Sequence, residues 1–167
     1  TRIGNKEFSD GQEKRNAALK HLLAAAIAKS IVGDLQMSRL DFETAADNYR
    51  QAIDALPPYQ EDLHAEYLNK YGTASYQAGQ HVAAISAFEK ALQILQKRLG
   101  KNHPDAATAM NNLALLYKKK GDLEGAETLL KQAIEIKEKN FDPGHPSLVT
   151  GLRNYASLLR ALVRNEE

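Results

Sequence analysis

The feature that most constrains this 167-residue chain is an internal repeat. The dipeptide His103-Pro104 recurs 42 positions later as His145-Pro146. A period of this length is typical of solenoids, in which each unit buries its apolar face by stacking on a neighbour. The same shift aligns Asn69 with Asn111, Gly79 with Gly121, Ala84 with Ala126, Phe88 with Leu130, Ala91 with Ala133 and Asn112 with Asn154. Towards the N-terminus a shift of 39 aligns Gly33, Ala45, Tyr49 and Ala52 with Gly72, Ala84, Phe88 and Ala91.

Each unit contains two helical patterns separated by a turn. In the clearest unit the first apolar face comprises Met110, Leu113, Ala114 and Tyr117, at the spacing of an α-helix. Gly121 is a residue expected just after a helix, and Asp122 is one expected to cap the next helix. The pattern therefore predicts an all-α chain of helical hairpins.

Small and large residues alternate on the second helix of each unit. We predict that the alanines lie where the two helices of a hairpin cross, because a short side chain permits close approach of the helix axes. The large residues would then fill the space towards the next hairpin. The alanines are Ala45, Ala84 and Ala126, and the large residues are Tyr49, Phe88 and Leu130.

Two long strings resemble tetratricopeptide repeats: YGTASYQAGQHVAAISAFEKAL and NNLALLYKKKGDLEGAETLLKQAI. The period of 42 residues and the HPD and HPS starts are similar to the kinesin light chain subtype. The resemblance implies a right-handed superhelical solenoid of antiparallel helix hairpins, with about three and a half units and an extended N-terminal helix. It also implies a concave groove that holds a peptide or a partner protein. The first unit matches least well, because Leu40 stands where the others have glycine.

These patterns divide the chain into five parts. We expect an N-terminal polar segment and helical extension (1–24), three complete units (25–60, 61–102 and 103–144), and a last single helix (145–167) that is either the first helix of a fourth unit or a terminal cap. The predicted helices are 10–38, 41–56, 60–77, 81–98, 104–119, 123–140 and 146–164. The extension would either fold over the first hairpin as a cap or pair with another chain. The last helix would be a cap or part of a longer array.

In this family the first helix of each hairpin lines the groove, so the resemblance implies which residues face a ligand. Asparagine amides both donate and accept hydrogen bonds, and Asn111, Asn112 and Asn154 are therefore predicted to hold a peptide backbone. An alternative is that some of them bond between repeats. The full predicted set is Asn69, Lys70, Tyr76, Asn111, Asn112, Lys118, Lys119, Arg153, Asn154 and Arg160.

Charge is distributed unevenly along this predicted groove. Lys118, Lys119, Arg153 and Arg160 make its C-terminal half basic, so we expect a ligand with acidic side chains or a C-terminal carboxylate near the third and fourth units. The alternative is that the lysines are a solvated helix end favoured by the helix dipole. The related chaperone-tail clamp is not expected, because its places hold Ser30 and the acidic Asp34.

Composition argues against several other functions. The chain lacks cysteine, and its net charge of +1 gives no general attraction to nucleic acid or membrane. Neither a phosphate loop nor a zinc motif is present, and His103 and His145 fit structural turns better than a metal site. We therefore expect no enzyme activity, cofactor or metal, and a cytoplasmic location. The function expected is a peptide-binding scaffold; the alternatives are self-assembly through either terminal helix, or a regulatory module of a larger protein.

Overall fold

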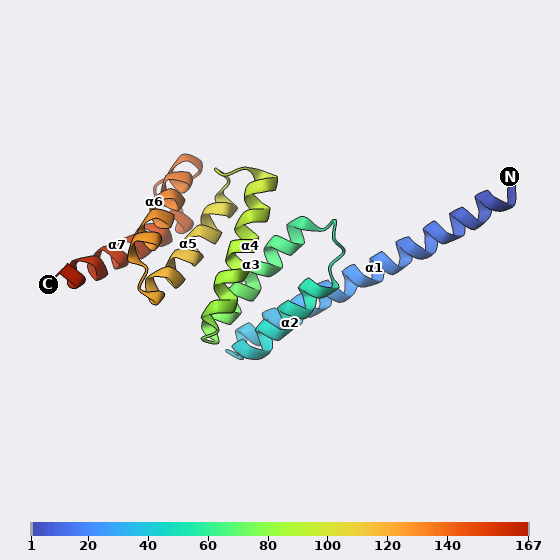
Figure 1. The fold of residues 1–167 in the computed structure, drawn as a ribbon, viewed down its shortest axis with the longest axis horizontal. Coiled ribbons are helices and arrows are strands. Elements are labelled where there is room, and N and C mark those ends of the chain that lie inside the picture. Colours follow the sequence, from blue (N-terminus) through green and yellow to red (C-terminus); the bar gives the residue numbers. More distant parts are fainter. Residues whose placement is uncertain (1, 167) are drawn as a thin grey trace.

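The computed structural model describes the backbone of residues 2–166 and the side chains of residues 11–163. Within that range the fold consists of seven α-helices without a strand (Figure 1). Their bounds are α1 Arg2–Ser38, α2 Phe42–Ala55, α3 Glu61–Gln77, α4 His81–Leu99, α5 Pro104–Lys120, α6 Leu123–Asn140 and α7 Pro146–Glu166. Six of the seven predicted helices are correct to within two residues at each end.

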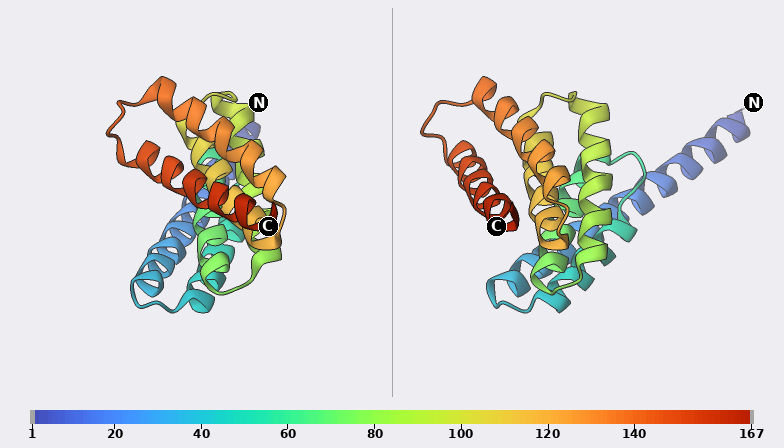
Figure 2. Two further views of the ribbon diagram at one scale, coloured as in Figure 1. Left: turned by 90° about the vertical axis from the view of Figure 1, so that its left-hand side faces the viewer. Right: turned by 60° about the vertical axis from the view of Figure 1, so that its left-hand side comes forward.

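The helices form antiparallel hairpins that stack in a row. The hairpins are α1–α2, α3–α4 and α5–α6, and each second helix also packs on the first helix of the next unit. Figure 2 shows from two further sides that the hairpins do not surround a common axis. Among the first helices, α3 also contacts α5, and α5 contacts α7. We call the surface formed by α1, α3, α5 and α7 the groove surface. The architecture is the superhelical solenoid expected from the repeat.

The turns inside the hairpins require a left-handed backbone. Gly79 has a φ of 77° and Gly121 a φ of 90°. Leu40 takes the same place in the first hairpin, with a φ of 60°, and its side chain is exposed. A side chain with a β-carbon is strained in this region, so Leu40 lowers the stability of the first turn.

Replacing Leu40 with glycine is therefore expected to stabilise the protein. Relief of left-handed strain is worth about 1–2 kcal/mol, and the added freedom of the unfolded chain offsets about half of it. We expect a net gain of about 0.5–1 kcal/mol in the free energy of unfolding, measured by urea denaturation. The control is Leu40→Ala, which keeps the strain; an equal gain in both variants would contradict this explanation.

A close contact inside the first and second hairpins explains a glycine that helix propensity disfavours. A β-carbon built on Gly33 would lie 2.6 Å from the ring of Tyr49, and one on Gly72 would lie 2.8 Å from the ring of Phe88. In the third hairpin the equivalent position is Ala114, and it packs with the smaller Leu130. Thus a glycine on the first helix faces a large aromatic ring in the first two hairpins, whereas an alanine faces a smaller leucine in the third.

The alanines are buried as predicted. Ala45, Ala84 and Ala126 are all 0% exposed. Ala126 packs with Ala114 of its own hairpin and with Leu158 of α7. Each large residue has two roles, because Phe88 meets Gly72 in its own hairpin and Leu113 in the next.

The first helix differs from the prediction at its N-terminal end. It begins at Arg2, not near residue 10, and runs as one continuous helix past Gly11. A single glycine costs a helix only about 1 kcal/mol, so it did not end this one. The extension projects away from α2 instead of folding over the first hairpin, so the expectation of a cap is wrong (Figure 1). Thr1 and Glu167 lie outside the described residues.

One charged side chain is buried in the core. Lys137 is 2% exposed, and its Nζ donates to the backbone oxygen of Ser147 at 3.2 Å. The repeat aligns it with Leu95, which is also buried. Burial lowers the pKa of Lys137, because the charged form loses its hydration.

Candidate binding groove

A large hollow on the groove surface lies between the second and third units. Its volume is about 670 Å³, and helices α3, α4 and α5 contribute its walls. Two predicted site residues, Asn69 and Lys70, line it. The other lining residues are Asp62, Glu66, Leu95, Arg98, Leu99, His103, Asp105 and Thr108.

Lys70 is held by the first unit. Its Nζ donates to both carboxylate oxygens of Asp34, at 2.9 and 3.0 Å, and lies 3.5 Å from Glu66. The hydroxyl of Tyr49 also donates to Asp34, at 2.7 Å. Burial would raise the pKa of Asp34, but the hydrogen bonds from Tyr49 and Lys70 outweigh it and lower that pKa. Lys70 therefore links α3 to α1. Its ammonium group is already paired with carboxylates of the chain and is not free to pair with a ligand.

Two further predicted site residues connect the third unit to α7. Asn111 is 5% exposed, and its Oδ1 accepts a hydrogen bond of 3.0 Å from Nδ2 of Asn154. Nζ of Lys118 donates to Oγ of Ser157 at 2.7 Å and to the backbone oxygen of the same residue at 3.1 Å. At this junction the polar side chains bond between repeats, which is the alternative role considered for the asparagines.

The junction between α3 and α5 lacks the corresponding bond. The repeat places Asn69 and Asn112 where the next junction has Asn111 and Asn154. Oδ1 of Asn69 is buried, but it has no hydrogen-bond partner among the described residues. Asn112 is partly exposed on the neighbouring helix. A buried acceptor left unpaired is costly, so this oxygen lacks a donor that the later junction supplies to Asn111.

The remaining predicted cations lie on the same surface. Nζ of Lys119 lies 5.1 Å from the ring centre of Tyr76, which brings two predicted site residues together across α3 and α5. Arg153 and Arg160 are exposed on α7 and make no ion pair within the described residues. In the hollow itself acidic groups predominate, because Arg98 is already paired with Glu61 and Asp62.

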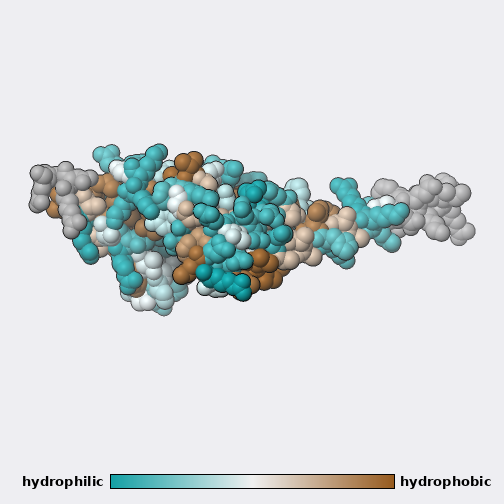
Figure 3. All heavy atoms as spheres, turned by 90° about the horizontal axis from the view of Figure 1, so that it is seen from below, coloured by the Kyte–Doolittle hydropathy of each residue, from teal (hydrophilic) through white to brown (hydrophobic). Residues whose placement is uncertain are grey.

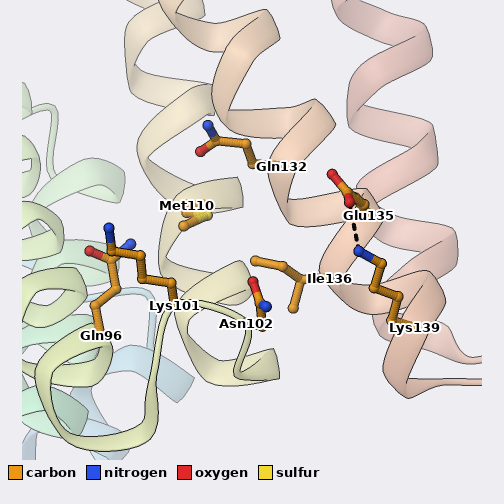
Figure 4. A pocket seen from close by; sticks show the side chains of 8 residues that line it. All are labelled: Gln96, Lys101, Asn102, Met110, Gln132, Glu135, Ile136 and Lys139. Carbon is orange, nitrogen blue, oxygen red and sulfur yellow. Dashed lines mark hydrogen bonds and ion pairs between the residues drawn. The ribbon is translucent and has the colours of Figure 1, made fainter.

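Two smaller hollows lie beside the hairpins, and sequence reasoning did not find them. One, of about 310 Å³, is mostly apolar, with Val82, Ile85 and Leu116 inside and Lys119 and Lys120 in its lining. The other, of about 250 Å³, lies between the loop after α4 and the C-terminal half of α6 (Figure 4). Within it Glu135 and Lys139 pair with each other at 2.7 Å, and Met110 and Ile136 are the apolar part of its lining. Side chains from different helices line each of these hollows, so the helical periodicity of the sequence does not predict them.

The two repeated histidines have the turn role that was predicted. Nδ1 of His103 accepts a hydrogen bond from the backbone N–H of Asp105, and Nδ1 of His145 accepts one from that of Ser147, both at 3.2 Å. The described residues contain no cluster of three side chains suited to a metal ion. Nor does any described helix combine the length and apolar character needed to span a bilayer.

A family model described as tetratricopeptide repeat matches residues 63–139, which span the second and third hairpins. Among curated proteins, the RxLR effector protein SFI4 of Phytophthora infestans (strain T30-4) is 32% identical over 79 residues. That match covers 46% of this chain, and it spans only 23% of the relative's length.

Solved structures share the fold at low sequence identity. BtubC (BKLC) from P. vanneervenii has a TM-score of 0.72 at 18% identity, covering 94% of this chain and 68% of that one. A kinesin light chain-like protein of Podosopora anserina with nearly identical TPR-like repeats has a TM-score of 0.71 at 21% identity, covering 80% and 65%. The first repeat domain of Spaghetti (RPAP3), bound to the HSP90 peptide SRMEEVD, has a TM-score of 0.62 at 16% identity, covering 84% and 95%.

Proposed function

We propose that this chain, whose residues 63–139 match the tetratricopeptide repeat family and whose fold is similar to that of a kinesin light chain-like protein, binds an extended peptide segment of a partner protein at the junction of α3 and α5. The observation that carries the proposal is the buried Oδ1 of Asn69, which lacks a partner among the described residues. Asn69 is partly exposed and lines the hollow, so a turn of its side chain would bring this oxygen to a backbone N–H of the ligand. The amide of Asn112, one helix away, would donate to a ligand carbonyl.

The size of the hollow supports an extended ligand. A volume of about 670 Å³ holds several peptide units, and both polar and apolar groups line it. Leu95 and Leu99 offer apolar contact, while Thr108 and His103 offer hydrogen bonds. A segment bound here would run along the groove surface past the first helices of the second and third units.

The charges support a ligand that is acidic at one end. Lys119, Arg153 and Arg160 lie towards the C-terminal half of the groove surface, so acidic side chains or a C-terminal carboxylate would be favoured there. The acidic lining at Asp62 and Glu66 disfavours the same groups in the hollow. The HSP90 peptide bound by the repeat domain of Spaghetti, SRMEEVD, is also acidic near its C-terminus.

A selection from a library of random heptapeptides with free C-termini tests the proposal. We expect peptides enriched in aspartate and glutamate, and expect Lys119→Glu with Arg153→Glu to weaken their binding by about tenfold or more, measured by fluorescence anisotropy. We choose Lys119 over Lys118 because Lys118 is bonded to Ser157 and its loss would disturb packing.

The matched control makes the same charge change at two exposed positions outside the first helices, as Lys90→Glu with Lys101→Glu. Its affinity for the selected peptides is expected to stay within about twofold of the parent. Asn69→Ala should weaken peptides of every charge, because it removes a contact to the backbone. Enrichment of basic peptides, or equal losses in both double variants, would rule the proposal out.

A further inference from the structure

An apolar stripe with the spacing of a coiled coil runs along the exposed side of α1. The exposed residues Ala24, Ala28, Ile31 and Leu35 follow one another at intervals of four, three and four. These intervals alternate as the two apolar positions of a heptad do. Ile31 is 61% exposed and Leu35 is 48% exposed. The pattern extends N-terminally through the exposed His21 and Ala17.

The stripe is wider than four residues. Ile27 flanks it on one side and Val32 on the other, and these side chains are 41% and 40% exposed. Charged side chains are absent from the stripe between Ala24 and Leu35. Figure 3 shows brown and tan apolar surface where α1 leaves the solenoid. A continuous apolar face of this kind on a single helix is a candidate interaction surface.

The residues that the structure describes leave this stripe uncovered, although the later units cover theirs. The repeat aligns Ala28 and Leu35 with Tyr67 and Ala74 of α3, which are buried by packing against α2. On α1 the helix α2 occupies the opposite face, next to Gly33. A preceding helix would have to turn back just before residue 24, but α1 continues unbroken from Arg2.

We propose that a second copy of this chain covers the stripe, with the two α1 helices packed side by side and antiparallel. In the register that fits best, Ala24 of one copy lies opposite Leu35 of the other, and Ala28 lies opposite Ile31. His21 then lies opposite Ser38 at the polar ends of the seam. The interface is isologous, so it closes as a dimer and does not propagate.

The distribution of large and small residues favours the antiparallel direction. The small residues Ala24 and Ala28 lie in the N-terminal part of the stripe, and the large residues Ile31 and Leu35 lie in the C-terminal part. Antiparallel packing sets each large side chain against a small one and keeps the helices evenly spaced. Parallel packing would set alanine against alanine and leave gaps, which close-packed interfaces avoid.

The dimer adds to the peptide-binding function and does not depend on it. Its seam lies on α1, while the proposed peptide contacts lie on α3, α4, α5 and α7 and at His103. Copies joined in this way would carry two groove surfaces, so a partner with two binding segments would be held more tightly than one with a single segment.

The mass of the protein in solution tests the proposal. The parent is expected to show about twice its monomer mass of 18.5 kDa by sedimentation equilibrium at about 100 µM. Ile31→Lys with Leu35→Lys should give a monomer at the same concentration. Both residues are exposed, so the variant should keep the helix content and melting temperature of the parent.

The matched control places the same substitutions on α7, as Leu152→Lys with Leu159→Lys. These two residues are also exposed, at 42% and 40%. The control should remain dimeric. A monomeric parent, or a dimer lost in the α7 variant and kept in the α1 variant, would overturn the proposal.

A pair of introduced charges tests whether the two α1 helices pack antiparallel. Leu35→Lys alone should weaken the dimer by at least about tenfold, and adding Ala24→Glu should restore it. In the antiparallel register the new lysine of one copy meets the new glutamate of the other across the seam, and the opposite charges attract. A parallel seam would instead set like charges against each other. Failure of Ala24→Glu to restore the dimer would refute the antiparallel register.

Discussion

Replacing Ala126 with tryptophan is expected to lower the free energy of unfolding by at least about 3 kcal/mol. Ala126 is 0% exposed and packs with Ala114, Leu130 and Leu158. Three helices, α5, α6 and α7, meet at this point. An indole ring cannot fit unless α6 moves away from both neighbours, so the substitution separates the third hairpin from the end of the solenoid.

Thermal unfolding followed by circular dichroism measures this effect. A loss of about 3 kcal/mol corresponds to a fall of about 6–12 °C in the melting temperature for a chain of this size. The control is Ala156→Trp, at an exposed position on α7, which should leave the melting temperature nearly unchanged. If both variants melted alike, Ala126 would not lie at the helix crossing.

Replacing Gly72 with alanine should cost about 2 kcal/mol, although alanine is the better helix former. The new β-carbon would lie 2.8 Å from Cε1 of the buried Phe88 and would push the two helices of the second hairpin apart. The third hairpin shows how the contact tolerates alanine, because Ala114 packs with leucine there. Gly72→Ala combined with Phe88→Leu should therefore be more stable than the sum of the two single effects.

The four proteins of this double-mutant cycle are compared by urea denaturation. We expect a favourable coupling energy of at least about 1 kcal/mol between positions 72 and 88. Gly151→Ala is the matched control, because its β-carbon would lie 3.5 Å from Ile134, an ordinary contact. That variant should gain about 0.5–1 kcal/mol from helix propensity. Additive effects in the cycle would show that the close contact between Gly72 and Phe88 does not affect the stability of the hairpin.

Much of the fold could be predicted because its signals are local. The helix that begins at Pro104 and the glycine at 121 were found from residue types within a few positions. The cap at Asp122 was found in the same way, and its carboxylate accepts the predicted kind of bond from the backbone N–H of Gly125, at 2.9 Å. The alanine at 126 was found from the repeat, since the same position is small in every unit.

Less could be predicted about the contacts of the candidate site residues. The repeat placed Asn69, Asn111 and Asn154 on the first helices of their units, but it could not show that the last two bond to each other. It marked Lys70 and Lys118 as ligand groups, while the structure pairs Lys70 with Asp34 and Lys118 with Ser157. Such pairs form between units, and their partners differ from one junction to the next.

The sequence by itself determined the helices, their turns and the stacking of hairpins, because helical periodicity and turn chemistry depend on neighbouring residues. Only the tertiary structure decided which polar side chains hold the units together and which, like Asn69, remain without a partner among the described residues. It also decided that α1 projects as a straight helix with an open apolar stripe. These features depend on the distances and angles between packed helices, which side chains from several units set together.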